Sequence, residues 1–177
     1  MLRVFLLAAI ILINYVMQTT LWQEWAILGV TPDTALILIV SYAIMRGEIE
    51  GALFGAASGF VLDVLSGVHI GLYTGMGFVV GYVSGKPFRN FFKDNYFLPF
   101  IIVTVMAVLY QLVLYIVQFM FVVRIDFWFF MYAIVLPKTV YTAALAIPLY
   151  SVFHYANARL ETYEKNRRTM FEDKADD

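Results

Sequence analysis

The chain has 177 residues, of which 62% are hydrophobic and 14% are charged, and its formal net charge is -1. Soluble globular domains average roughly 45–50% apolar and about 25% charged residues, so the composition excludes a soluble fold and requires lipid around much of the chain. The absence of cysteine excludes disulfides and thiolate chemistry. Because His69 and His154 are far apart, we expect no metal or cofactor, and nothing in the charge indicates a nucleic-acid partner.

Six apolar segments follow one another along the chain. A spanning helix needs about 20 apolar residues to cross about 30 Å of hydrocarbon. Residues 4–21 qualify, and no small-residue cleavage site follows them, so we expect an uncleaved first span. Residues 34–45 are short, and they span only if Asp33 and Arg46 lie near the two surfaces. The remaining runs are 51–66, 70–84, 98–123 and 127–153, and the last contains the expected kink sites Pro137 and Pro148.

The basic residues indicate the orientation of these segments. With the N-terminus inside, ten of the twelve lysines and arginines fall in cytoplasmic segments, whereas only Arg124 falls outside and Lys138 lies within the last span. This asymmetry obeys the positive-inside rule and requires an even number of spans. Continuous apolar runs favour helices over a barrel. The sequence therefore predicts an all-α, six-helix transmembrane bundle over residues 1–155, both termini in the cytoplasm, and a charged cytoplasmic tail over residues 156–177.

Glycine is concentrated in the third and fourth segments, mostly at four-residue intervals. Ten of the eleven glycines lie between residues 47 and 85. Small residues let helix backbones approach closely in lipid, where no hydrophobic force draws helices together. The candidate positions for helix packing, or for a face that a partner's helix occupies, are Gly51, Gly55, Gly59, Gly71, Gly77 and Gly81. Packing within the chain is the simpler interpretation, and a partner face is compatible with it.

Two charged residues lie inside predicted spans. A carboxylate there costs roughly 2.5–3.5 kcal/mol on insertion scales, so it needs a partner. At about 1.5 Å per residue, Asp63 lies some 18 Å from Gly51, and Lys138 lies about 16 Å from the outer surface. The two depths are similar, so we predict an intramembrane ion pair between Asp63 and Lys138. A pair that fixes the fold is favoured over a proton or substrate relay, and snorkelling of Lys138 is an alternative.

The remaining polar candidates have simpler interpretations. Asp33 follows Pro32 and opens the second helix, where an acid complements the positive end of the helix dipole. Asn14 and Gln18 share a face of the first helix, and Gln111 and Gln118 share one of the fifth. These four are candidates for hydrogen bonds between helices or for lining a small polar cavity. Since no nucleophile with a base, paired carboxylates or phosphate loop appears, we do not expect an enzyme.

An ordered set of proline, acidic and glycine positions resembles one family. These positions are Pro32-Asp33, Gly47, Gly51, Gly55, Gly59-Phe60-x-x-Asp63, Gly71, Gly81, Leu136-Pro137 and Pro148-Leu149-Tyr150. Together with the length and the six expected spans, they resemble the rod shape-determining protein MreD family. The resemblance implies a non-catalytic scaffold of the cell-elongation (rod) complex in the bacterial cytoplasmic (inner) membrane, required for rod shape and lateral peptidoglycan synthesis.

The resemblance also implies partners and a fold. The direct partner is the bitopic protein MreC, and actin-like MreB filaments and peptidoglycan synthases are indirect partners. The fold is expected to resemble the six-helix substrate-binding subunits of energy-coupling-factor vitamin transporters. A transporter subunit of this kind is an alternative function. Its alanine-x-x-x-alanine pattern is absent, however, because the residues four positions after Ala8 and Ala9 are Leu12 and Ile13. An ion or proton carrier that uses Asp63 is a third possibility.

Overall fold

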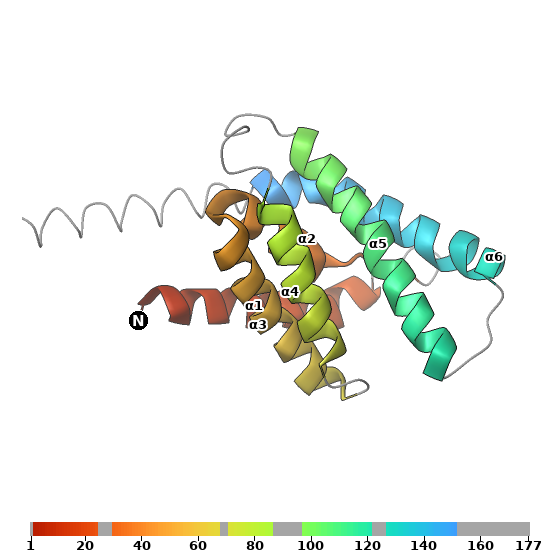
Figure 1. Ribbon diagram of the computed structural model, residues 1–177, viewed down its shortest axis with the longest axis horizontal. Helices are drawn as coiled ribbons and strands as arrows, with labels where there is room; N and C mark the ends of the chain where they lie inside the picture. Colours follow the sequence, from red (N-terminus) through yellow and green to blue (C-terminus); the bar gives the residue numbers. More distant parts are fainter. Residues whose placement is uncertain (1, 25–29, 68–70, 87–96, 122–126, 152–177) are drawn as a thin grey trace, which may run out of the picture.

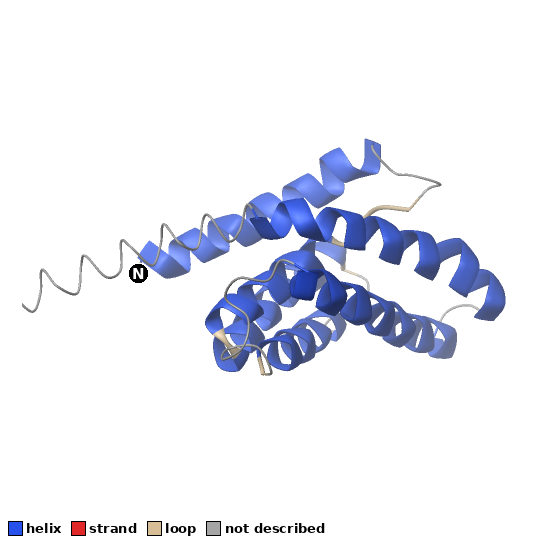
Figure 2. Ribbon diagram, turned by 90° about the horizontal axis from the view of Figure 1, so that it is seen from above, coloured by secondary structure: helices blue, strands red, loops and turns tan. Residues whose placement is uncertain are grey.

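The structure, a computed structural model, describes residues 2–24, 30–67, 71–86, 97–121 and 127–151. This part of the chain is almost entirely helical (Figure 2). Its helices are α1 (Leu2–Glu24), α2 (Thr34–Arg46), α3 (Glu48–Ser66), α4 (Leu72–Gly85), α5 (Phe97–Phe121) and α6, which begins at Phe127–Phe130 (Figure 1). The six helices occupy the six segments that hydropathy predicted, so the predicted all-α class is confirmed for the described residues. The predicted tail over residues 156–177 lies outside them.

Three of these helices are long and apolar enough to cross a membrane. They are Glu48–Ser66, Phe100–Val117 and Phe127–Ser151. Two further apolar helices, Phe5–Thr20 and Thr34–Arg46, are shorter. The helices therefore fit a membrane protein, whereas the count of six spans stays a prediction.

The last helix contains a π-helical turn. The residues after Phe130 form the π-helix η1 (Met131–Val135), and α-helix then continues to residue 151. Below, the name α6 stands for this whole helix, Phe127–Ser151. The backbone N–H of Leu136 donates to the carbonyl of Met131, five residues earlier. Pro137 has no N–H, and its ring clashes with the carbonyl four residues earlier in a regular α-helix. The wider turn relieves this clash, and it also resets which face the following residues present.

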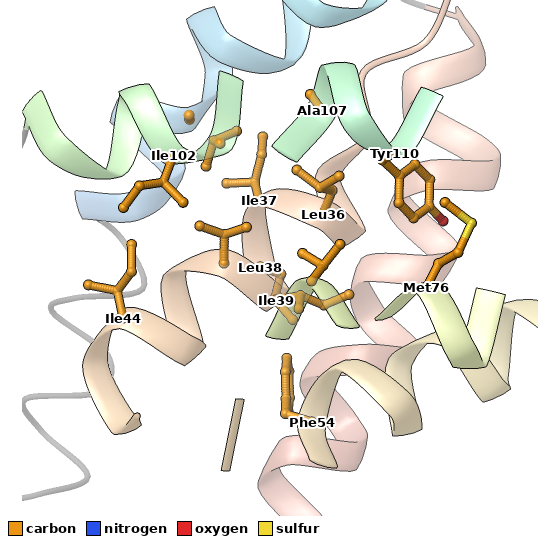
Figure 3. Packing of buried hydrophobic residues seen from close by; sticks show 14 of the residues in the cluster. Leu36, Ile37, Leu38, Ile39, Ile44, Phe54, Met76, Ile102, Ala107 and Tyr110 are labelled. Carbon is orange, nitrogen blue, oxygen red and sulfur yellow. The ribbon is translucent and has the colours of Figure 1, made fainter. Parts of the chain in front are cut away.

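Helix α2 lies at the centre of the fold. Ten of its thirteen residues are buried, and it contacts α1, α3, α4 and α5. A helix that is apolar on every side is buried, because each of its faces packs against a neighbour. Figure 3 shows Leu36, Ile37 and their neighbours on α2, with Ala107 and Tyr110 of α5 on one side and with Met76 of α4 and Phe54 of α3 on the other. The core is thus built around the second helix.

Helices α2, α3 and α4 are held together tightly. Gly47 alone connects α2 to α3, and its φ of 96° lies in the region that favours glycine. Its N–H closes α2 by donating to the carbonyl of Ala43. Helices α3 and α4 then lie side by side as an antiparallel hairpin (Figure 1). This three-helix unit positions both buried acids described below.

Candidate functional site

The first feature of the site is Asp33, which holds the beginning of α2 against α6. Its Oδ1 accepts the backbone N–H of Leu36 at 3.2 Å, so Asp33 is the N-cap of α2. Its own N–H donates to Oγ1 of Thr142 at 3.0 Å, across 109 residues of sequence. Its Oδ2 lies 3.9 Å from Nζ of Lys138. One residue therefore caps a helix and attaches it to another helix at two points.

Helix α2 begins inside the protein. Asp33 is buried, with 7% of the residue exposed, and the preceding Pro32 is fully buried. Burial by other helices does not measure depth in a membrane, so the position of Asp33 near a membrane surface stays a prediction. Non-helical backbone is tolerated at membrane depth where protein buries it or where it lines a water-filled cavity. Here the contacts from α6 satisfy part of the exposed helix end.

The second feature is Asp63, which caps α4 from the neighbouring helix. Gly71 precedes α4 and offers no capping side chain. In its place, the carboxylate of Asp63 accepts the backbone N–H of Tyr73 at 3.0 Å and that of Thr74 at 2.8 Å. The hydroxyl of Thr74 donates to it as well. Since helix N-termini carry unsatisfied donors and positive partial charge, a carboxylate is well stabilised there.

The predicted ion pair between Asp63 and Lys138 is wrong. Lys138 pairs with Asp33, and the oxygens of Asp63, a residue that is 1% exposed, accept bonds from α4. The prediction compared depths along straight helices. It could not take account of the rotation of each helix about its axis or of the end of α4 that lies beside Asp63. The charge of Asp63 is stabilised by helix-end donors rather than by an ammonium group.

The glycines form the third feature, a contact between the backbones of α3 and α4. A Cβ added at Gly55 would collide with the carbonyl of Gly77, and one added at Gly77 would collide with the carbonyl of Gly55. Gly51 and Gly81 are related in the same way, and a Cβ at Gly59 would meet the carbonyl of Tyr73. At these five positions there is no room for a side chain unless the backbone shifts. Five of the six candidate glycines therefore lie in an interface within the chain.

The sixth candidate glycine, Gly71, lies apart from this interface. It precedes α4 with a φ of 93°, and no atom lies within 4 Å of the position of its Cβ. The same open space surrounds Gly75, one turn into α4. These two glycines do not pack against any described part of the chain. Gly71 is required by its backbone conformation, since side chains disfavour a positive φ.

Among the described residues, no hydrogen bond joins the polar candidates on α1 and α5 to Asp33 or Asp63. Asn14 and Gln18 are partly buried on α1, and Oε1 of Gln18 has no hydrogen-bond partner among the described residues. Gln111 is buried on α5, with 4% of the residue exposed. Gln118 lies on the same helix, but its side chain is outside the described part.

Two threonines were missed by the sequence analysis. Thr74 and Thr142 contact the two acids, and Thr142 is fully buried. For Thr74 a signal existed, because α4 has no capping residue of its own and an acid lies shortly before the turn that leads into it. For Thr142 no local signal exists, since its partner is 109 residues away. Taken together, the contacts around both acids perform helix capping and helix attachment.

The sequence matches the family described as rod shape-determining protein MreD over residues 1–157 of the 177. The chain belongs to the MreD family. Its long apolar helices agree with a membrane protein that determines rod shape, as membership of the MreD family implies. The predicted resemblance to the family is thereby confirmed. No curated protein and no solved structure gave a significant match, so the likeness to vitamin-transporter subunits stays a prediction.

Proposed function

We propose that this MreD-family chain is a non-catalytic scaffold of the bacterial cell-elongation complex, required for rod shape and for lateral peptidoglycan synthesis. The observation that carries the proposal is the family match, which extends over residues 1–157 and thus over every described helix. In this proposal the chain crosses the cytoplasmic membrane six times with both termini inside. A single-span protein of the MreC type binds it directly, and MreB filaments and peptidoglycan synthases are linked through that partner.

The way the two buried acids are used supports a structural role. A proton or ion carrier needs a carboxylate that can exchange its partner during a cycle. The carboxylate of Asp63 accepts bonds from Tyr73 and Thr74, which fix the start of α4. Asp33 fixes the start of α2 in a similar way. Because release of either group would leave helix-end donors unsatisfied, both are better suited to holding a shape than to carrying a proton.

The outer faces of the helices support a role in helix-to-helix binding. Side chains spaced along one face of α5 are large, apolar and exposed, and so are those along one face of α3. They are Ile101, Val105, Leu109, Val113 and Ile116 on α5, and Ile49, Leu53, Phe60 and Val64 on α3. Such faces suit lipid or the transmembrane helix of a partner. A rigid bundle with apolar faces of this kind is what a scaffold within a membrane requires.

Complementation of rod shape tests the proposed function. Rod-shaped cells depleted of their own MreD-family protein are expected to become round, and expression of this chain should restore rods. Affinity purification of the chain in mild detergent should then recover a single-span wall-elongation protein. Cells that stay round despite correct insertion of the chain would contradict the proposal. Recovery of an ATPase module or a bound vitamin would instead support a transporter subunit.

A further inference from the structure

Lys138 is a charged residue in the middle of an apolar helix, and part of it is exposed. Its side chain is 22% exposed, and Nζ lies 3.9 Å from Oδ2 of Asp33, which is longer than a hydrogen bond. An ammonium group has three donor hydrogens, so Asp33 leaves this donor capacity largely unused. Charged groups within a membrane face the bundle interior or a water-filled cavity rather than lipid. The exposed part of Lys138 therefore requires water.

The residues that follow the two members of this ion pair in sequence carry buried hydroxyls without partners. Thr34 follows Asp33 on α2, and Thr139 follows Lys138 on α6. The residues are 1% and 7% exposed, respectively, and neither Oγ1 finds a hydrogen-bond partner among the described residues. Buried polar groups in proteins are nearly always bonded to protein or to ordered water. Ordered water would satisfy both hydroxyls.

The backbone at this place leads to the same requirement. The chain approaches α2 through the non-helical residues 31–33 and begins the helix inside the protein, beside α6. Non-helical backbone at membrane depth occurs where protein buries it or where it borders water. Asp33 contacts both Lys138 and Thr142. We call these three residues, together with their sequence neighbours Thr34 and Thr139, the α2–α6 junction.

We propose that water penetrates the bundle at the α2–α6 junction, solvates the ammonium group of Lys138 and hydrogen-bonds to the hydroxyls of Thr34 and Thr139. The junction is then a hydrated polar site inside a membrane protein, reached from the aqueous phase past the side chain of Lys138. This property goes beyond the proposed scaffold role, because a bundle that only binds helices needs no water in its interior.

The chain suits a thiol test, because it contains no cysteine. Thr139→Cys and Thr34→Cys are placed in lipid nanodiscs and treated with methyl methanethiosulfonate, which is small, uncharged and able to enter lipid. Only the thiolate reacts, and a thiol that is buried in dry, apolar surroundings ionises little. The controls on α6 are Val140→Cys, at an exposed apolar position (61%), and Ala146→Cys, at a fully buried one (1%).

The hydrated junction predicts that both threonine-site thiols react at least about tenfold faster than both control thiols, since the rate is proportional to the fraction of thiol that is ionised. Rates equal to those of the controls would overturn the proposal.

If the cysteine variants do not fold, the isosteric Thr139→Val replaces them. Loss of a water-bonded hydroxyl lowers the unfolding midpoint, whereas loss of an unbonded buried hydroxyl raises it. A raised midpoint in Thr139→Val would therefore also overturn the proposal, and Thr142→Val, which loses an observed acceptor, supplies the reference for a lowered one.

Discussion

Asp63 near the end of α3 binds Thr74 in the first turn of α4 through both the backbone N–H and the hydroxyl of the threonine. Both donors meet the same carboxylate oxygen, Oδ2. The relationship supplies α4 with the cap that Gly71, immediately before it, cannot provide. A single acid on one helix thus sets where the next helix begins.

Removal of the Asp63 carboxylate should destabilise the protein. Asp63→Ala leaves buried donors of α4 without an acceptor, and we expect a loss of about 1–3 kcal/mol in the free energy of unfolding. Asp63→Asn keeps one acceptor oxygen and should lose less. Thermal unfolding in detergent measures both variants. Thr74→Val is the matched control, because it removes only the hydroxyl bond. Equal midpoints for Asp63→Ala and the native chain would contradict the capping role.

The glycine contact between α3 and α4 should not tolerate even one methyl group. Gly55→Ala places a Cβ against the carbonyl of Gly77, and backbone cannot move aside as a side chain can. We expect a loss of about 1–3 kcal/mol in unfolding free energy, as for overpacked cores. Gly75→Ala is the control, since its Cβ position is open. Should both variants unfold at the same temperature, α3 and α4 are not packed backbone to backbone.

A variant at Gly75 can separate an effect on folding from an effect on partner binding. Gly75→Leu adds bulk to an exposed face of α4 and should leave the unfolding midpoint close to that of the native chain. Recovery of the proposed single-span partner with this variant then reports on the α4 face alone. Reduced recovery at unchanged stability would place the partner there, whereas reduced stability would show that Gly75 packs within the chain.

The attraction between Asp33 and Lys138 should be measurable apart from capping. Asp33→Asn keeps a side chain that caps helices well but removes the charge. Breaking a buried pair from one side costs more than removing both charges. We therefore expect Asp33→Asn and Lys138→Met each to lower the unfolding midpoint, and the double variant to lower it by less than their sum. Additive effects would show that the two side chains do not interact.

Orientation in the membrane is checked by a reporter. The distribution of basic residues predicts that both ends lie in the cytoplasm. Green fluorescent protein fused after residue 177 should fluoresce, and alkaline phosphatase at the same position should be inactive. The opposite pattern would place the C-terminus outside the cell and contradict the predicted orientation.

The helical segments could be predicted because composition and hydropathy depend on each residue alone. The spacing of Gly51, Gly55 and Gly59 indicated close packing, but which glycine faces which is a matter of helix register. The partner of Lys138 could not be predicted, since depth along a helix says nothing about rotation about its axis. The π turn before Pro137 alters that rotation further. Contacts that join distant segments, such as that of Asp33 with Thr142, have no local signal in the sequence.

The attachment of Asp33 to α6 has a consequence for how the chain is made. Thr142 and Lys138 leave the ribosome more than a hundred residues after Asp33. Until the final helix is synthesised, the start of α2 lacks two of its contacts. The α3–α4 hairpin, by contrast, already has the glycines of both its helices. Assembly thus finishes with α6. In a nascent chain halted before Lys138, the start of α2 is not yet attached to the last helix.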